Sequence, residues 1–392
     1  MLQKLMRIGA AAAALALVIS APVGAETIKV GIIGPLSGPF ALGGKNFKAG
    51  VEAYVATHGD TVAGNKVEFV YRDLDGPDPG KAKSVAQDLI IKEKVQYLGG
   101  VYLTPSAFAI APMLEEANVP LVIFNAATSS ITQKSPLIVR TSFTLWQTAV
   151  PLAKQVAKDG VKKLIITVTD YGPGNDAEAA FRKTFEAAGG KVVETIKMPL
   201  SATDFSPFLQ RVKDSDAEAV FAFLPSGAST VGFAKAYVES GLKEKGIKLL
   251  ATGDVTEESG LQAVGDAAIG IRTTYHYSLV HDSALNRDFV AAATKAIGNP
   301  DELSFPSVAA YDGAHVIYKM IEATAGKQDA KTAVQSVLGL AWESPRGPVK
   351  IDPATRSLTQ TIYLREVAKE NGRLVNKEIA SYPDQPDWGL VK

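Results

Sequence analysis

The stretch TIKVGIIGPLSGP, residues 27–39, opens an alternation of strands and helices that decides the fold. Its first seven residues are rich in β-branched side chains and predict a strand, which Gly34 and Pro35 end. Residues 119–124, VPLVIF, are apolar throughout, as is typical of a parallel strand covered on both faces. Because helical patterns lie between such strands, the sequence predicts a parallel, doubly wound sheet.

The same strand and helix pattern is built twice along the chain. In the first series we expect strands at 27–33, 66–71, 95–98 and 119–124 and helices at 46–57, 79–93 and 106–117. In the second we expect helices at 147–159, 176–188, 205–212 and 229–240 and strands at 163–169, 191–197, 219–224, 247–252 and 270–275. Beyond it we expect helices at 285–297, 308–325 and 330–336 and short strands at 349–351 and 361–367. Two sequential sheets with a helical remainder predict a bilobed α/β protein.

The composition excludes several classes of function. The chain has 392 residues, 46% of them hydrophobic, with 41 Lys+Arg against 41 Asp+Glu and no Cys. The missing Cys excludes disulfides, thiol catalysis and Cys-based zinc sites. Balanced charge without a basic block argues against nucleic acid as a partner. The four His residues are scattered and none has the spacing of a metal pair, so we expect no metal and no cofactor.

The first 25 residues have the pattern of a secretory signal. Lys4 and Arg7 are followed by an apolar run at 8–19 and by the small residues Val-Gly-Ala at 23–25. The apolar run is shorter than the ~20 residues that cross a bilayer, so we expect export without stable membrane insertion. No Cys follows the run, which leaves no site for a lipid anchor, and we expect cleavage after about Ala25.

Loops at the carboxyl ends of the expected strands are where a parallel α/β sheet binds its ligand. Residues 99–106 and 125–130 offer hydroxyls and backbone N–H groups there without a fixed charge, which favours a small carboxylate, although each hydroxyl can also be a plain helix cap. In the second series Tyr171 offers an aromatic face for a ligand. Asp254 offers a charge for an ammonium or hydroxyl group of the ligand, or alternatively it caps the N-terminus of the following segment. Glu257 and Glu258 are expected to be solvated.

Enzyme motifs are not found. The sequence has no G-x-S-x-G, no H-E-x-x-H and no P-loop, and the loop after the first strand lacks G-x-G-x-x-G. We therefore expect a protein that is not an enzyme. An exported hydrolase is the alternative, and it would need a nucleophile or metal that these patterns do not show.

Four segments together resemble the branched-chain amino-acid-type periplasmic binding proteins, the solute receptors of ABC importers. They are IKVGIIGPLSGP at 28–39, PLVIFNAAT at 120–128, DYG at 170–172 and AYDGA at 310–314. The resemblance covers residue 26 to about residue 390 and implies the type I fold, with two doubly wound lobes joined by a three-crossing hinge. The implied crossings lie near 141–145, 275–277 and 347–358.

This resemblance also implies a domain organisation and partners. The first lobe comprises 26–143 plus 278–356 and the second 144–277 plus 357–392. A periplasmic protein is implied, expected to be a monomer, that captures a small carboxylate between its lobes and delivers it to an ABC transporter membrane permease. A soluble sensor that passes its ligand to a separate signalling receptor is an alternative with the same fold.

Site residues follow from the same resemblance. Thr104, Ala126 and Thr128 match the carboxylate-binding positions of the family, with Ala126 acting through its backbone. Tyr171 matches the aromatic residue of the second lobe that closes on the ligand. Asp254 matches the acidic residue that takes the ammonium group in amino-acid binders.

The identity of the ligand is left open by the residues around these positions. Gly43 stands where amino-acid binders often place an aromatic side chain, and it leaves room. With Phe40, Tyr102, Trp146 and Phe305 nearby, the pocket would be large and flat and would suit an aromatic acid, such as a benzoate or phenylpyruvate derivative, or an aromatic or branched amino acid. The alternative is that these aromatics are core residues and the ligand is a plain branched-chain amino acid.

Overall fold

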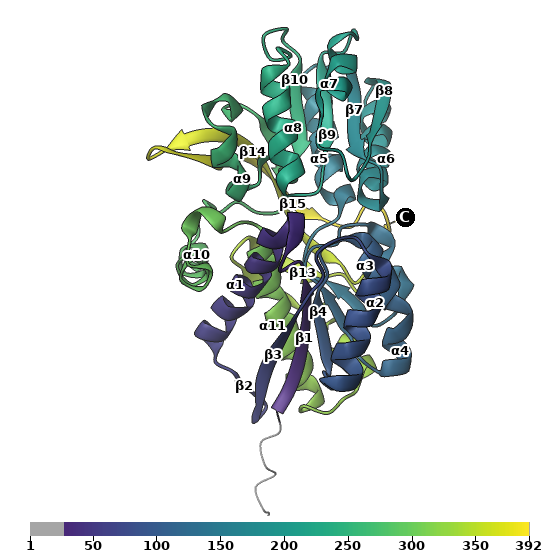
Figure 1. Cartoon of the computed structure of the whole chain (residues 1–392), viewed down its shortest axis with the longest axis vertical. Coiled ribbons are helices and arrows are strands. Elements are labelled where there is room, and N and C mark those ends of the chain that lie inside the picture. Colours follow the sequence, from purple (N-terminus) through teal and green to yellow (C-terminus); the bar gives the residue numbers. More distant parts are fainter. Residues whose placement is uncertain (1–26, 392) are drawn as a thin grey trace, which may run out of the picture.

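A computed structural model describes residues 27–391, which form two lobes stacked end to end (Figure 1). The sheet of the first lobe has the strand order β2-β3-β1-β4-β5-β6. Its strands are β1 (Thr27–Gly34), β2 (Thr61–Val62), β3 (Asn65–Asp73), β4 (Tyr97–Gly100), β5 (Leu121–Ile123) and β6 (Ile138–Arg140). All of these pairings are parallel except that of β2 with β3, so the predicted parallel sheet is confirmed. The sequence analysis did not identify β2 and β6, which are too short to give a pattern.

Helices from an early and a late part of the sequence cover the two faces of this first sheet. On one face α1 (Ala41–His58) packs against α10 (Ala284–Ile297) and α11 (Pro306–Thr324), and α11 packs against α12 (Ala330–Val337). On the other face lie α2 (Pro79–Gln87), α3 (Thr104–Ile110) and α4 (Leu114–Ala117) (Figure 1). Helices from late in the sequence therefore pack on the same face of the first sheet as α1. α1 begins at Ala41, earlier than expected, and the helix expected at 79–93 ends in a π-helical turn, Asp88–Lys92.

The sheet of the second lobe contains a parallel half and an antiparallel half. Its order is β12-β13-β14-β11-β10-β9-β7-β8. The parallel strands are β7 (Lys163–Thr169), β8 (Lys191–Met198), β9 (Ala219–Phe223), β10 (Lys248–Thr252) and β11 (Arg272–Tyr275). Their helices are α5 (Leu145–Lys158), α6 (Gly172–Ala187), α7 (Ser206–Lys213), α8 (Ala228–Glu239) and α9 (Glu258–Val264). The second doubly wound unit is thus confirmed.

An antiparallel group completes the second sheet. It comprises β12 (Ala341–Ser344), β13 (Gly347–Ile351), β14 (Leu358–Glu370) and β15 (Arg373–Gln385). The sequence analysis expected shorter versions of β13 and β14 and missed β12 and β15. Because β12 and β13 hydrogen-bond into the second sheet, they are an exception to the assignment of 278–356 to the first lobe. The lobe boundaries themselves stay a prediction.

A buried ion pair ties β12 and β13 back to the first lobe. Arg346 Nη2 lies 2.5 Å from Asp312 Oδ2 on α11, and both side chains are at most 1% exposed. Trp342 Nε1 and Ser344 Oγ also donate to this carboxylate, at 2.9 and 2.7 Å. Arg346 Nη2 donates to Thr141 O at 2.9 Å, in the segment where the chain first crosses between lobes. Because a buried charge without its partner is costly, this cluster holds the segment around Arg346 against the segment around Thr141.

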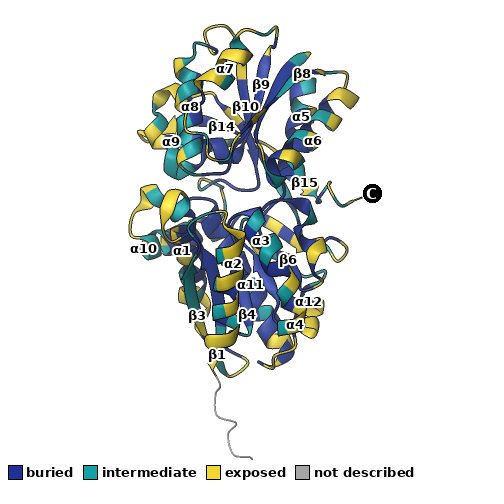
Figure 2. Ribbon diagram, turned by 45° about the vertical axis from the view of Figure 1, so that its right-hand side comes forward, coloured by how far each residue is buried: buried dark blue, intermediate teal, exposed yellow. Residues whose placement is uncertain are grey.

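Burial follows the layers of the fold. In both lobes the central strands are buried, and exposed residues lie on the outer faces of the helices and on the edge strands (Figure 2). Within the residues described, no helix is both long enough and apolar enough to cross a bilayer. Residues 1–26 lie outside this range, so the predicted signal sequence is not described. The carboxyl ends of β4, β5, β7, β9 and β10 all point toward the junction of the lobes, which places the ligand-binding edge of each sheet there.

Candidate functional site

A small cavity of about 10 Å³ lies where the carboxyl ends of the two sheets meet. Both lobes line it. The first contributes Tyr102, Leu103, Thr104, Asn125, Ala127 and Phe143, and the second Tyr171, Pro173, Phe223, Pro225, Ser226 and Asp254. Four of the predicted site residues, Tyr102, Thr104, Tyr171 and Asp254, are therefore brought together from distant parts of the chain.

The first-lobe wall offers hydroxyl groups and no charge. Thr104 begins α3, where Pro105 is accommodated in the first turn, and its Oγ1 lies 3.1 Å from Thr128 Oγ1. Both threonines are buried. The N-terminus of α6 faces them, since a Cβ atom at Gly172 would lie 2.6 Å from Thr128 Oγ1. Two hydroxyls and the positive end of a helix are suited to a carboxylate.

Ala126 differs from the expectation. Its N–H donates to Val101 O at 3.1 Å, so the backbone group that the resemblance gives to the ligand is occupied. The neighbours of Ala126 line the cavity instead, and Asn125 Nδ2 donates to Tyr102 O at 2.9 Å, which orders the loop after β5.

On the second-lobe wall lies Asp254, a carboxylate surrounded by hydroxyl groups. Thr252 Oγ1 donates to Oδ2 at 2.8 Å, and Ser226 Oγ and Tyr275 OH donate to Oδ1 at 3.2 Å each. Asp254 is only 4% exposed, and burial raises its pKa to about 6. With three donors already in place, Asp254 has little hydrogen-bonding capacity left for an ammonium ion and is better suited to accept a single hydrogen bond from a ligand hydroxyl.

Aromatic rings enclose the space between these polar ends. Tyr171 lies nearly parallel to Phe223, with ring centroids 6.2 Å apart and an interplanar angle of 16°. Phe143 closes the first-lobe side of the cavity. Burial raises the pKa of the Tyr171 and Tyr102 hydroxyls well above the usual value, so both are neutral donors. A flat apolar ligand body fits such walls better than a branched one.

Hydrogen bonds across the cleft show that the lobes are closed in this structure. Tyr102 OH donates to Ser226 O at 3.2 Å, and Ser129 N–H donates to Asp176 Oδ2 at 2.9 Å. A space of about 10 Å³ is that of roughly one water molecule. An aromatic ligand therefore needs the lobes further apart than they are here.

The other predicted aromatic residues occupy three different places. Phe40 lines a neighbouring interlobe cavity and packs on the Tyr102 ring at 5.8 Å. Phe305 is buried behind the site, edge-on to Tyr275 at 4.8 Å. Trp146 does not lie with these residues: it lines a separate groove with Trp388, between α5 and the C-terminal segment. Trp146 does not line the cavity at Asp254, so the prediction that it faces the ligand is not supported.

Gly43 also needs a correction. The sequence analysis expected free space there, but a Cβ atom at Gly43 would lie 2.3 Å from the Tyr102 ring. The ring of Tyr102 has taken the space that a larger residue would fill. The small residue at position 43 therefore permits this placement of Tyr102 and does not by itself enlarge the ligand pocket.

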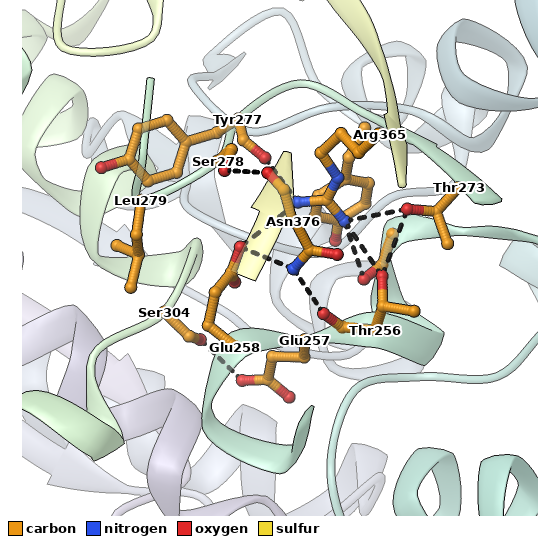
Figure 3. Close-up of polar contacts among 12 residues, drawn as sticks. Thr256, Glu257, Glu258, Thr273, Tyr277, Ser278, Leu279, Ser304, Arg365 and Asn376 are labelled. Atoms are coloured by element: carbon orange, nitrogen blue, oxygen red, sulfur yellow. Dashed lines mark hydrogen bonds and ion pairs between the residues drawn. The ribbon is translucent and has the colours of Figure 1, made fainter. Parts of the chain in front are cut away.

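The expectation that Glu257 and Glu258 are solvated is wrong. Glu257 is 6% exposed, accepts a hydrogen bond of 2.6 Å from Ser304 Oγ of the first lobe, and its pKa is raised to about 7 by burial. Glu258 Oε1 accepts from Asn376 Nδ2 at 3.0 Å and pairs with Arg365 at 3.4 Å (Figure 3). Two adjacent acids look like a surface pair in sequence, and only the packing of β14, β15 and the first lobe buries them.

Several residues of the site were missed. Ser226 and Tyr275, which hold Asp254, and Phe143 and Phe223, which enclose the cavity, were not singled out in the sequence. The available signal was position, since Ser226 lies two residues after the expected strand at 219–224 and Tyr275 ends the one at 270–275. In the described part of the chain no group of His, Asp and Glu side chains could hold a metal ion.

Known proteins match this chain over nearly its whole length. A sequence model of the family described as periplasmic binding protein matches residues 27–373. The Leu/Ile/Val-binding protein homolog 6 of Brucella melitensis is 61% identical over 367 residues, which are 93% of this chain and 94% of that protein.

Solved structures agree. A solute-binding protein of an ABC transporter from Rhodopseudomonas palustris HaA2, in complex with p-hydroxybenzoic acid, is 58% identical with a TM-score of 0.92, covering 93% of this chain and 99% of that one. Another, from Rhodopseudomonas palustris BisB5 in complex with 3,4-dihydroxybenzoic acid, is 44% identical with a TM-score of 0.88, covering 93% and 99%.

Proposed function

The chain belongs to the periplasmic binding protein family, and from this premise we propose that it captures a hydroxylated aromatic carboxylate between its lobes and delivers it to an ABC importer. This family membership and the two-lobe fold confirm the resemblance seen in the sequence. The family and its solved neighbours are substrate-binding proteins, and we propose that this chain, too, acts by binding and catalyses no reaction.

The observation that carries the proposal is the polarity of the cleft. Thr104, Thr128 and the N-terminus of α6 form a neutral, hydrogen-bond-donating end, and Asp254 forms an accepting end. Aromatic rings lie between them. A benzoate with a hydroxyl group opposite its carboxylate matches this order of groups. Its carboxylate would meet the threonines, its ring Tyr171, and its hydroxyl Asp254.

A hydrophobic amino acid is the second candidate, since relatives are named Leu/Ile/Val-binding proteins. In that mode Asp254 would take the ammonium group. The three hydroxyl donors of Asp254 weigh against this mode, because an ammonium ion gains most from a carboxylate with free lone pairs.

Binding couples to closure in this proposal. The ligand enters an open form, docks on the first lobe, and rotation about the crossings brings Tyr171 and Asp254 over it. The closed form is then read by a membrane permease. We propose that the mature chain starts near Glu26, resides in the periplasm and works as a monomer.

Titration calorimetry with the purified mature protein tests the ligand class. We expect 4-hydroxybenzoate to bind in the micromolar range or tighter, benzoate more weakly, and leucine and valine at least 100-fold more weakly than 4-hydroxybenzoate. Tight leucine binding without 4-hydroxybenzoate binding would show that the amino-acid mode is the true one. Turnover of an ester or amide substrate would instead support the hydrolase.

A further inference from the structure

A second cavity lies between the lobes, next to the one that contains Asp254. Its volume is about 240 Å³. Phe40, Gly43 and Tyr102 line it from the first lobe, and Ser226, Glu257 and Ser259 line it from the second. The mechanism proposed above makes no use of this space, which is far larger than the small cavity at Asp254.

Tyr102 is the partition between the two cavities. Tyr102 and Ser226 line both, and in this closed form the Tyr102 hydroxyl also donates to Ser226 O at 3.2 Å across the lobes. The ring is held by Phe40 at 5.8 Å and Phe47 at 5.9 Å. It also fills the space at Gly43, where a Cβ atom would clash with it. The partition is thus one well-packed side chain.

Beyond the partition, the second cavity has apolar walls and one polar end. Phe40, Val231 and Ala263 form part of the walls. The polar end is Glu257, whose Oε1 accepts the hydrogen bond from Ser304 Oγ at 2.6 Å. Such a space suits an apolar segment that ends in a hydrogen-bond donor, such as a phenol.

We infer that Tyr102 sets the maximum length of the ligand, and that the second cavity is a latent extension of the ligand site that takes the phenol end of longer aromatic acids once this side chain is shortened. The inference rests on the proposed binding of aromatic carboxylates. With the carboxylate held at Thr104, a ligand two carbon atoms longer than 4-hydroxybenzoate would drive its ring into Tyr102 in the wild type. In a shortened variant the same ring passes toward Glu257.

The test is the ratio of the dissociation constants for 4-hydroxycinnamate and 4-hydroxybenzoate, measured by calorimetry on the full mature chain. We expect the wild type to prefer 4-hydroxybenzoate at least 30-fold. Tyr102→Ala should lower this ratio at least tenfold. Tyr102→Leu, which keeps more of the packing against Phe40 and Phe47, should lower it in the same direction if the alanine variant does not fold. The matched control, Tyr102→Phe, keeps the ring and should stay within threefold of the wild-type ratio.

Failure of this inference is distinguishable from failure of the proposed function. A wild type that binds 4-hydroxybenzoate but accepts 4-hydroxycinnamate equally well overturns the role of Tyr102, and so does an unchanged ratio in the alanine and leucine variants. A wild type that binds neither acid overturns the proposed function itself. As a further arm, Glu257→Leu in the Tyr102→Ala background should narrow the gap in affinity between 4-hydroxycinnamate and cinnamate at least threefold. An unchanged gap would contradict the placement of the phenol in the second cavity.

Discussion

The two lobes share an architecture but present opposite chemistry to the cleft. The first lobe contributes neutral hydroxyls, Thr104 and Thr128, while the second contributes buried carboxyls, Asp254 and Glu257, whose pKa values are raised by burial. The same unit, built twice, thus places neutral hydroxyls at the strand ends of one lobe and buried carboxyls at those of the other. We propose that this difference sets the orientation of a bound ligand, with one end of the ligand at each lobe.

The largest expected effect comes from removing the acceptor of the second lobe. Asp254→Ala should weaken 4-hydroxybenzoate binding at least 100-fold, about 2.8 kcal/mol, because the ligand hydroxyl and three protein hydroxyls lose their partner. Benzoate, which has no such hydroxyl, should lose at least tenfold less in the same calorimetric titration. Asp254→Asn is the matched control and should retain part of the affinity. Equal losses for both acids would show that Asp254 does not meet the hydroxyl.

A pH dependence of stability distinguishes the buried carboxyl at Glu257 from an ordinary surface acid. Its pKa rises from 4.5 in the unfolded chain to about 7 in the folded one, so the folded state binds more protons between these values and loses stability as pH rises through this window. Glu257→Gln should remove this loss. The variant should therefore gain about 2 kcal/mol in unfolding free energy relative to wild type between pH 5 and pH 8.

Denaturant titrations at the two pH values measure this gain. Glu116→Gln, at an exposed position on α4, is the control and should follow the wild type. If the unfolding free energy of Glu257→Gln changes with pH in the same way as that of the wild type, the pKa of Glu257 is not raised in the folded protein. The contrast between the two lobes would then rest on Asp254 alone.

A smaller effect is expected from the aromatic wall. Tyr171→Ala should weaken 4-hydroxybenzoate binding at least tenfold, about 1.4 kcal/mol, because the second lobe loses the ring that we propose lies over the ligand. Tyr171→Phe should bind 4-hydroxybenzoate with an affinity close to that of the wild type, since it keeps the ring. An unchanged affinity in the alanine variant would remove Tyr171 from the site.

The smallest effect is expected at Trp146. Because its ring lies in the groove with Trp388, Trp146→Ala should change ligand affinity less than threefold. A loss comparable to that of Tyr171→Ala would restore the original prediction that this ring faces the ligand.

Strand positions were predictable because they depend on local composition. The strand expected at 163–169 matches β7, and that at 27–33 differs from β1 by one residue. The charged strand β15, with Pro383 near its end, gave no such signal, since its pairing is supplied by the long neighbour β14. A local sequence pattern identifies a strand whose own side chains are buried. It does not identify an exposed strand whose position depends on pairing with a neighbour.

The site was predictable in its strand-end positions and not in its contacts. Thr104, Tyr171 and Asp254 follow strands, and the fold brings them together. The burial of Glu257 depends on Ser304 of the other lobe, and the space at Gly43 depends on where Tyr102 packs. Both depend on contacts between residues far apart in the sequence, which local sequence patterns do not predict.

The most direct test of the account is a crystal structure of the mature protein with 4-hydroxybenzoate. We predict that the carboxylate lies within hydrogen-bond distance of Thr104 Oγ1 and the phenol oxygen within hydrogen-bond distance of Asp254, with the ring beside Tyr171. A ligand bound the other way round, with its carboxylate at Asp254 and its phenol oxygen at Thr104, would contradict the proposed roles of these two residues.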